Sequence, residues 1–212
     1  MGFWFGEQGQ IRKTLRDLVH LDIEVNDRDG LIVGEGHKGV LPDEDLRELS
    51  DELTSLLVTA LQLGHMADLA VANGRSHWEI RSVADYPAPN EHPDRWTVLM
   101  TLARDAFMAL RKHDQRSARA LYQRWLVLAR RPGLGLFLRL ALFAATQAEE
   151  WPFEELVEAL LANDAAALWN AECENELEAF FRRRGLVLEA GGLLDGILAA
   201  IRKGPPEEPN DD

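Results

Sequence analysis

Residues 134–147 read LGLFLRLALFAATQ, and this stretch decides how the chain folds. Its side chains are apolar on nearly every face that a helix would have, and Arg139 is its one charged residue. A helix that is apolar all round is buried on several sides by neighbouring elements. The stretch is also shorter than the roughly 20 residues that a membrane-spanning helix needs. We therefore expect a central, buried helix, with no membrane partner.

The sequence on both sides of this helix has the spacing of amphipathic helices. From residue 43 onward, apolar residues recur at intervals of three and four, as on a helix with one buried face. Helices of this length joined by short breaks pack as antiparallel neighbours. The sequence therefore predicts a mainly α fold, an irregular antiparallel helical repeat or bundle. The residues placed to cap its helices are Asp43 or Asp45, Asp94, Asp114, and Asn163 or Asp164.

The chain divides into three predicted regions. Residues 1–42 predict a short helix, a small β-hairpin at about 20–34 and a Gly-rich connection. Residues 43–203 predict the helical domain, which contains a long connection at 75–93 with apolar residues suited to packing. Residues 204–212 predict a disordered acidic tail.

Composition limits the chemistry and the compartment. The chain has 212 residues, 46% of them hydrophobic, which is enough to build a core without disulfides or metal. Cys173 is the only cysteine, so no internal disulfide and no multi-cysteine metal site can form. We expect a cytoplasmic protein, since a chain with one cysteine and no internal disulfide suits a reducing compartment. The formal net charge of −13 repels nucleic acid, which is therefore not an expected partner.

The negative average hides a separation of charge along the chain. Residues 104–140 hold nine Arg or Lys and two Asp, a balance of +7, whereas residues 141–181 hold ten acidic residues and no Arg or Lys. Arg116, Arg119, Gln123 and Arg130 fall on the side of their helix opposite Leu121, Trp125 and Leu128. We expect these basic residues to pair with the acidic helices that follow in the chain. The alternative is that Arg116, Arg119, Arg130 and Arg131 form an interaction surface for a partner.

No motif in the sequence predicts catalysis or cofactor binding. Residues 34–39 match G-x-G-x-x-G, but Pro42 follows where a dinucleotide site needs a helix to begin. Cys173 lies on an apolar face, which favours a structural thiol over a nucleophile. His65, His77 and His92 have acidic neighbours but lack H-E-x-x-H spacing, so surface or capping roles are preferred to metal binding. We accordingly expect no catalytic residue, cofactor or metal.

More than half of the chain resembles a known family. The residues that carry the resemblance are WEIRSV (78–83), WTVLM (96–100), RDAF (104–107), ARAL (118–121), LFLRLALFA (136–144), LWN (168–170) and GPP (204–206). In this order and spacing they resemble the long helical-repeat region of large bacterial anti-phage defence proteins, which carry a sirtuin-like or signal-transduction NTPase domain nearer their N-terminus. Arg81 stands where that family has Pro before the serine, which puts the fold of this connection in doubt.

The resemblance implies a sensor, scaffold or oligomerisation segment, as a fragment or a stand-alone relative. The catalytic motifs of those larger proteins fall outside the resembling stretch, so no catalytic residue is carried over. The leading expectation is a non-enzymatic α-helical scaffold that binds a protein partner or itself. Two alternatives stay open: a metal-dependent hydrolase using the three central histidines, and a nucleic-acid-binding protein using the basic helices at 104–131.

Overall fold

The computed structural model describes residues 42–66, 82–83, 97–148 and 151–206. These residues form eight α-helices and two short 3-10 turns, and they contain no strand. This confirms the predicted mainly α fold. The described residues belong to two compact units: residues 42–66 and 97–113 form the first, and residues 82–83, 114–148 and 151–206 form the second. The predicted N-terminal helix, the β-hairpin and the tail from Glu207 lie outside the described residues.

The first unit is built around α5 (Thr97–His113), against which α2 (Asp43–Glu48) and α3 (Ser50–Met66) both pack. A turn at Leu49 separates α2 from α3, so the single helix predicted from residue 43 is wrong at this point. The turn lets apolar side chains of both helices reach one core. That core consists of Leu46, Leu53, Leu102, Ala106 and Ala109.

Part of the apolar face that the leucine spacing predicts for this segment is exposed. Leu49 in the turn, and Leu56 and Leu63 of α3, are exposed instead of buried. Leu56 and Leu63 are seven residues apart and therefore share one side of α3, away from the side that packs on α5. The spacing of apolar residues in the sequence does not show which of two adjacent apolar rows on a helix packs against a neighbouring helix.

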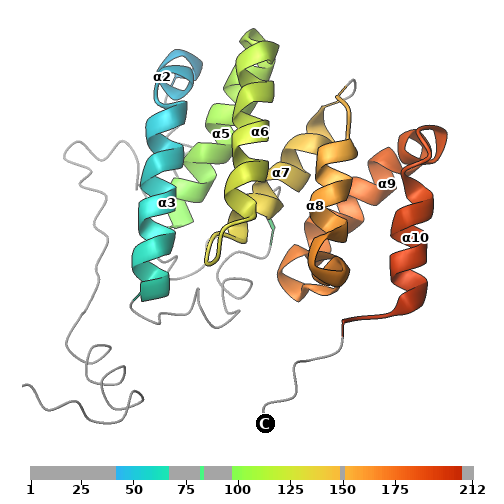
Figure 1. Ribbon diagram of the computed structural model, residues 1–212. Helices are drawn as coiled ribbons and strands as arrows, with labels where there is room; N and C mark the ends of the chain where they lie inside the picture. Colours follow the sequence, from blue (N-terminus) through green and yellow to red (C-terminus); the bar gives the residue numbers. More distant parts are fainter. Residues whose placement is uncertain (1–41, 67–81, 84–96, 149–150, 207–212) are drawn as a thin grey trace, which may run out of the picture. The chain divides into compact units, whose positions relative to one another are not determined.

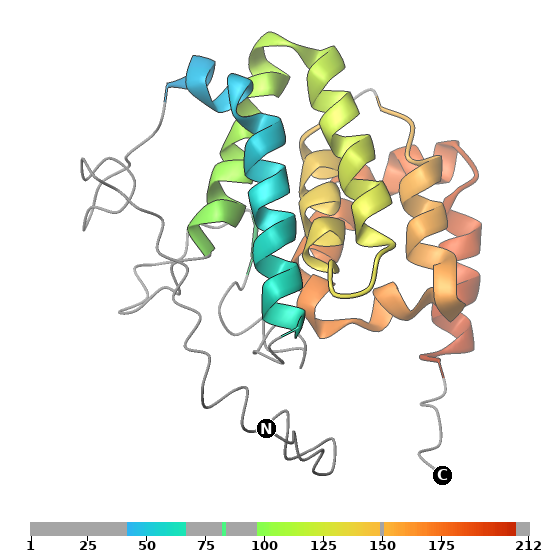
Figure 2. The same cartoon turned by 60° about the vertical axis from the view of Figure 1, so that its left-hand side comes forward.

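The second unit contains five helices in two layers. They are α6 (Gln115–Ala129), α7 (Leu136–Gln147), α8 (Glu154–Ala165), α9 (Glu174–Ala190) and α10 (Leu194–Lys203). Helices α6, α8 and α10 lie side by side, and α7 and α9 lie behind them (Figures 1 and 2). Ten of the twelve residues of α7 are buried, which confirms the prediction of a central helix.

A buried ion pair joins the two helices of the rear layer. Arg139 of α7 donates from Nε to Oε2 of Glu176 on α9 at 3.0 Å, and from Nη2 to Oε1 at 3.3 Å. The backbone N–H of Val83 donates to the same Oε1 at 2.6 Å. Both charged side chains are about 1% exposed. The pair therefore fixes α7, α9 and residues 82–83 relative to one another.

A second buried arginine, on α9, caps α7. Arg184 donates to the carbonyl oxygens of Ala145 and Thr146, at 3.2 and 2.8 Å. These carbonyls belong to the last turn of α7, where no helical N–H remains to bind them. A cation at this negative end of the helix is electrostatically favourable as well.

The corner between α8 and α9 differs from its prediction. Asn163 and Asp164 do not cap a helix: together with Ala165 they adopt positive φ angles of 51°, 55° and 60°. Two 3-10 turns follow, at Ala166–Trp169 and Ala171–Cys173, and α9 begins only at Glu174. Asn170 caps the second of these 3-10 turns, since its side chain accepts from the N–H of Glu172. Trp169, expected on a buried face, is 41% exposed because it precedes the helix.

Three arginines followed by Gly185 predict the end of a helix at residue 185, and this is also wrong, since α9 continues to Ala190. Arg184 is held on α7, and Leu188 one turn later is fully buried, so tertiary contacts on both sides of Gly185 keep the backbone helical. These contacts outweigh the weak helix propensity of glycine.

Replacing Gly185 with alanine is expected to stabilise the protein by about 0.5–1 kcal/mol, because glycine costs that much relative to alanine inside a helix. A Cβ at this position would meet no atom within 4 Å. Urea denaturation followed by circular dichroism measures the change. Gly196→Ala is the matched comparison in α10: its Cβ would lie 3.2 Å from Cδ1 of Leu161, so its gain should be smaller. Destabilisation by Gly185→Ala would contradict the helical assignment.

Candidate interaction surface on helix α6

The start of α6 is fixed by its capping residue. Asp114 accepts from the backbone N–H of Ser117 at 3.1 Å and from its hydroxyl at 2.7 Å, as the sequence predicted for this cap. These hydrogen bonds, the hydroxyl first, lower the pKa of Asp114 below its ordinary value. The cap fixes the residue at which α6 begins.

The solvent side of α6 carries the arginines that the sequence singled out. Leu121, Trp125 and Leu128 are buried, as expected for the opposite side. Arg116, Arg119 and Arg130 are exposed on one face, and Arg131 is exposed just beyond the end of the helix. Between them on this face lie Ala120, Gln123 and Val127, all exposed. We call these seven residues the α6 face.

An open cleft of about 500 Å³ lies beside the first half of the α6 face. This volume falls in the range of small-ligand sites, roughly 300–1,000 Å³. Its walls combine two guanidinium groups, two carboxamides, a methyl group and an indole. The lining residues are Gln115, Arg116, Arg119, Ala120, Gln123 and Trp151.

The indole of the cleft is supported from within the unit. Trp151 packs on Tyr122, with ring centroids 5.1 Å apart and planes inclined at 41°. Tyr122 is itself buried on α6, and its hydroxyl has no hydrogen-bond partner among the described residues. Burial, and secondarily the charge of Glu155, raise the pKa of Tyr122 well above its usual value. The neutral, buried ring of Tyr122 therefore supports the indole of Trp151 through packing.

The arginines of the α6 face form no ion pair within the described part of the chain. Arg116, Arg119, Arg130 and Arg131 lie within ion-pair distance of no carboxylate of residues 42–66, 82–83, 97–148 or 151–206. The pairing with acidic helices that we expected for them is therefore not met among these residues, although Arg139 of the same basic segment pairs with Glu176. The charge of Arg116 acts on the nearby carboxylate of Asp114, and all four arginines are exposed.

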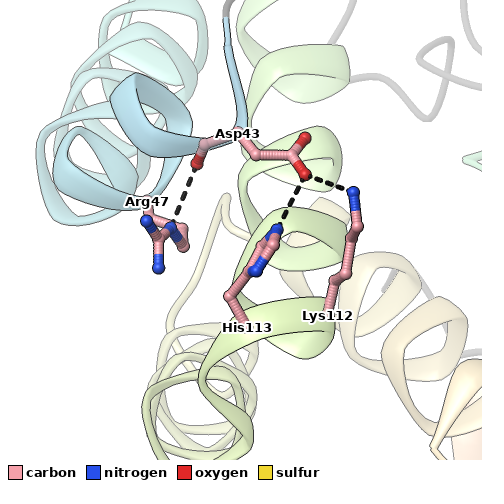
Figure 3. Close-up of polar contacts among 4 residues, drawn as sticks. All are labelled: Asp43, Arg47, Lys112 and His113. Carbon is pink, nitrogen blue, oxygen red and sulfur yellow. Dashed lines mark hydrogen bonds and ion pairs between the residues drawn. The ribbon is translucent and has the colours of Figure 1, made fainter.

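A second polar cluster, in the first unit, has a structural role. Oδ2 of Asp43 accepts from Nζ of Lys112 at 2.8 Å and contacts Nε2 of His113 at 3.0 Å (Figure 3). These hydrogen bonds, that from Lys112 first, lower the pKa of Asp43. Asp43 lies in the first turn of α2, and its two partners lie in the last turn of α5. Each charge complements its helix dipole, so the cluster ties two helix ends together.

The alternative of a metal-dependent hydrolase needs three histidines whose side chains lie outside the described residues. His77 and His92 lie outside the described residues, and nothing is shown of the side chain of His65. Within the described ranges, no group of three or more His, Cys, Asp or Glu residues is placed to hold a metal ion.

Cys173 lies in the core, as its sequence position predicted. It is 2% exposed. Burial, reinforced by Glu176 and opposed by Arg139, raises the pKa of the thiol to about 12. The thiolate needed for nucleophilic chemistry is therefore strongly disfavoured at neutral pH.

We expect Cys173 to react with a disulfide reagent at pH 8 at least about a hundredfold more slowly in the native protein than in urea, because both access and the thiolate are suppressed. Release of the coloured thiolate measures the rate. Since this is the only cysteine of the chain, the unfolded protein is its own control. Equal rates in both states would show that the thiol is accessible.

Comparisons with known proteins identify no family for this chain. No protein-family model, curated protein or solved structure matches the chain. Among the described helices, none is both long and apolar enough to cross a membrane.

Sequence periodicity predicted the α6 face but not the cleft. The helical spacing placed Arg116, Arg119 and Gln123 together, and the structure has them together. It did not assign Trp151 to this site, since that residue stands 28 positions beyond Gln123, on the far side of α7 in the sequence. The one available signal was an aromatic residue directly before the Pro152 that leads into α8.

Proposed function

We propose that this protein is a non-enzymatic α-helical scaffold that binds a protein partner through the α6 face. The single observation that carries the proposal is a row of exposed arginines, none of them in an ion pair with a described carboxylate, beside a cleft lined by Trp151. Arginine and tryptophan are the residue types most enriched among the energetically dominant residues of protein interfaces. The opposite side of α6 packs into the core of its own unit, where Trp125 is completely buried, and this packing supplies the rigidity that a scaffold needs.

We place this scaffold in the cytoplasm, within a bacterial anti-phage defence system. The compartment is supported by the single buried cysteine. The defence context is supported by the resemblance of residues 78–206 to the helical-repeat region of large defence proteins.

Affinity capture from the native host tests the proposal. The full-length chain should retain a specific protein, and Arg116→Glu with Arg119→Glu should reduce this retention at least about tenfold, since two like charges would then oppose the partner. The matched control is Arg183→Glu with Arg202→Glu, which reverses the same number of exposed charges on α9 and α10. Light scattering on the same samples detects self-association.

Two results would contradict the proposal. One is a chain that remains monomeric and retains no protein. The other is a retained protein whose binding is reduced equally by the two double reversals, because the α6 face would then not be the binding surface.

A further inference from the structure

The α6 face combines charge and apolar surface along its whole length. From Arg116 to Arg130 the helix advances by 14 residues, about 21 Å at 1.5 Å per residue. Arginines stand at the two ends of this row. Between them lie first the cleft and then Val127, whose side chain is 57% exposed. A ligand that fills only the 500 Å³ cleft would leave Val127 and Arg130 unused.

The cleft selects for an aromatic or apolar group with a carboxylate beside it. Two guanidinium groups, those of Arg116 and Arg119, line the cleft, and a guanidinium can bind a carboxylate through two parallel N–H···O hydrogen bonds. The indole of Trp151, backed by Tyr122, offers a flat surface for stacking. The carboxamides of Gln115 and Gln123 can bind backbone N–H and C=O groups, which a peptide supplies.

We propose that the partner contributes an extended acidic segment of about seven or eight residues. One acidic residue and its aromatic neighbour occupy the cleft, an apolar residue covers Val127, and a second acidic residue reaches Arg130. An extended chain advances about 3.3 Å per residue, so seven steps cover the length of the row. The proposal rests on the proposed function, because the segment belongs to the protein partner.

Charge complementarity favours an acidic segment over a nucleic acid. The arginines of the α6 face attract carboxylates, while the whole chain has a net charge of −13. A long polyanion would extend far beyond the face and meet more of that negative charge than a short segment would. The exposed apolar side chain of Val127, between Gln123 and Arg130, offers no favourable contact to a phosphate backbone.

Synthetic peptides test the segment directly. The probe EFSGSGLE and its reverse, ELGSGSFE, are titrated into the full-length chain and followed by NMR. Controls are QFSGSGLQ, which lacks the charges, and EFSG, which reaches only the cleft. At least one octapeptide should shift the α6 amides and bind at least tenfold more tightly than both controls. Arg130→Glu should weaken the octapeptide at least fivefold but leave EFSG unchanged, and Arg116→Glu should weaken both.

Three outcomes would overturn the inference. They are equal binding of EFSGSGLE and QFSGSGLQ, equal binding of EFSG and the better octapeptide, and tighter binding of single-stranded octathymidylate than of either octapeptide. If the host protein is retained through the α6 face but neither octapeptide binds, the scaffold function stands and the acidic segment is wrong. If no protein is retained at all, the function itself fails.

Discussion

Glu176→Ala is expected to lower the free energy of unfolding by about 3–5 kcal/mol, the usual cost of removing one partner of a buried ion pair. The substitution leaves the guanidinium of Arg139 in a fully buried site without its carboxylate. It also removes the acceptor of the Val83 N–H, and an unsatisfied buried donor costs about 1–3 kcal/mol. Urea denaturation followed by circular dichroism measures the loss.

The control lies two residues away on the same helix. Glu178 pairs with Arg182 four residues later, but the two side chains are 60% and 77% exposed. Glu178→Ala should therefore cost no more than about 0.5 kcal/mol. Equal losses for the two variants would show that Glu176 is not buried as described.

Two further variants separate charge from hydrogen bonding. Glu176→Gln keeps an acceptor for the Val83 N–H but leaves Arg139 unpaired, so most of the loss should remain. Arg139→Met combined with Glu176→Leu removes both charges and should recover part of the stability, since apolar replacements of buried pairs are often tolerated. The recovery should stay incomplete, because the Val83 N–H still lacks its acceptor. Full recovery would contradict a structural role for that hydrogen bond.

Trp125→Ala is expected to destabilise the protein by about 3–5 kcal/mol, the range for truncating a buried aromatic residue to alanine. Trp125 is completely buried on the side of α6 that packs against α7, the central helix of its unit. The change would leave a large cavity between two helices that the neighbouring side chains can fill only in part. Thermal or urea unfolding measures the effect.

Val127→Ala provides the matched control for Trp125→Ala. It truncates a side chain of the same helix, two residues away, that is 57% exposed. Surface substitutions of this kind stay within about 0.5 kcal/mol. Trp125→Phe should lie between the two, since it keeps part of the buried ring. Comparable losses for Trp125→Ala and Val127→Ala would contradict the orientation of α6, and with it the exposure of the arginines.

The row of arginines in the candidate surface could be predicted from the sequence, but the cleft beside it could not. Arg116 and Arg119 share a face with Gln123 because residues three and four apart are neighbours on any helix. The cleft needs Trp151 as well, and its position follows from how the chain returns after α7. The Asp43 cluster is similar: its partner Lys112 lies 69 residues away, and no local pattern connects them.

Local sequence is enough to predict the helical nature of the described chain, the burial of α7 and the cap of α6 at Asp114. These features follow from apolar periodicity and from hydrogen bonds within a few residues. Three other features depend on the folded arrangement: the turn at Leu49, the passage of α9 through Gly185, and the pairing of Arg139 with Glu176. In each case the deciding energy comes from contacts between residues far apart in the chain, and those contacts outweigh local propensity.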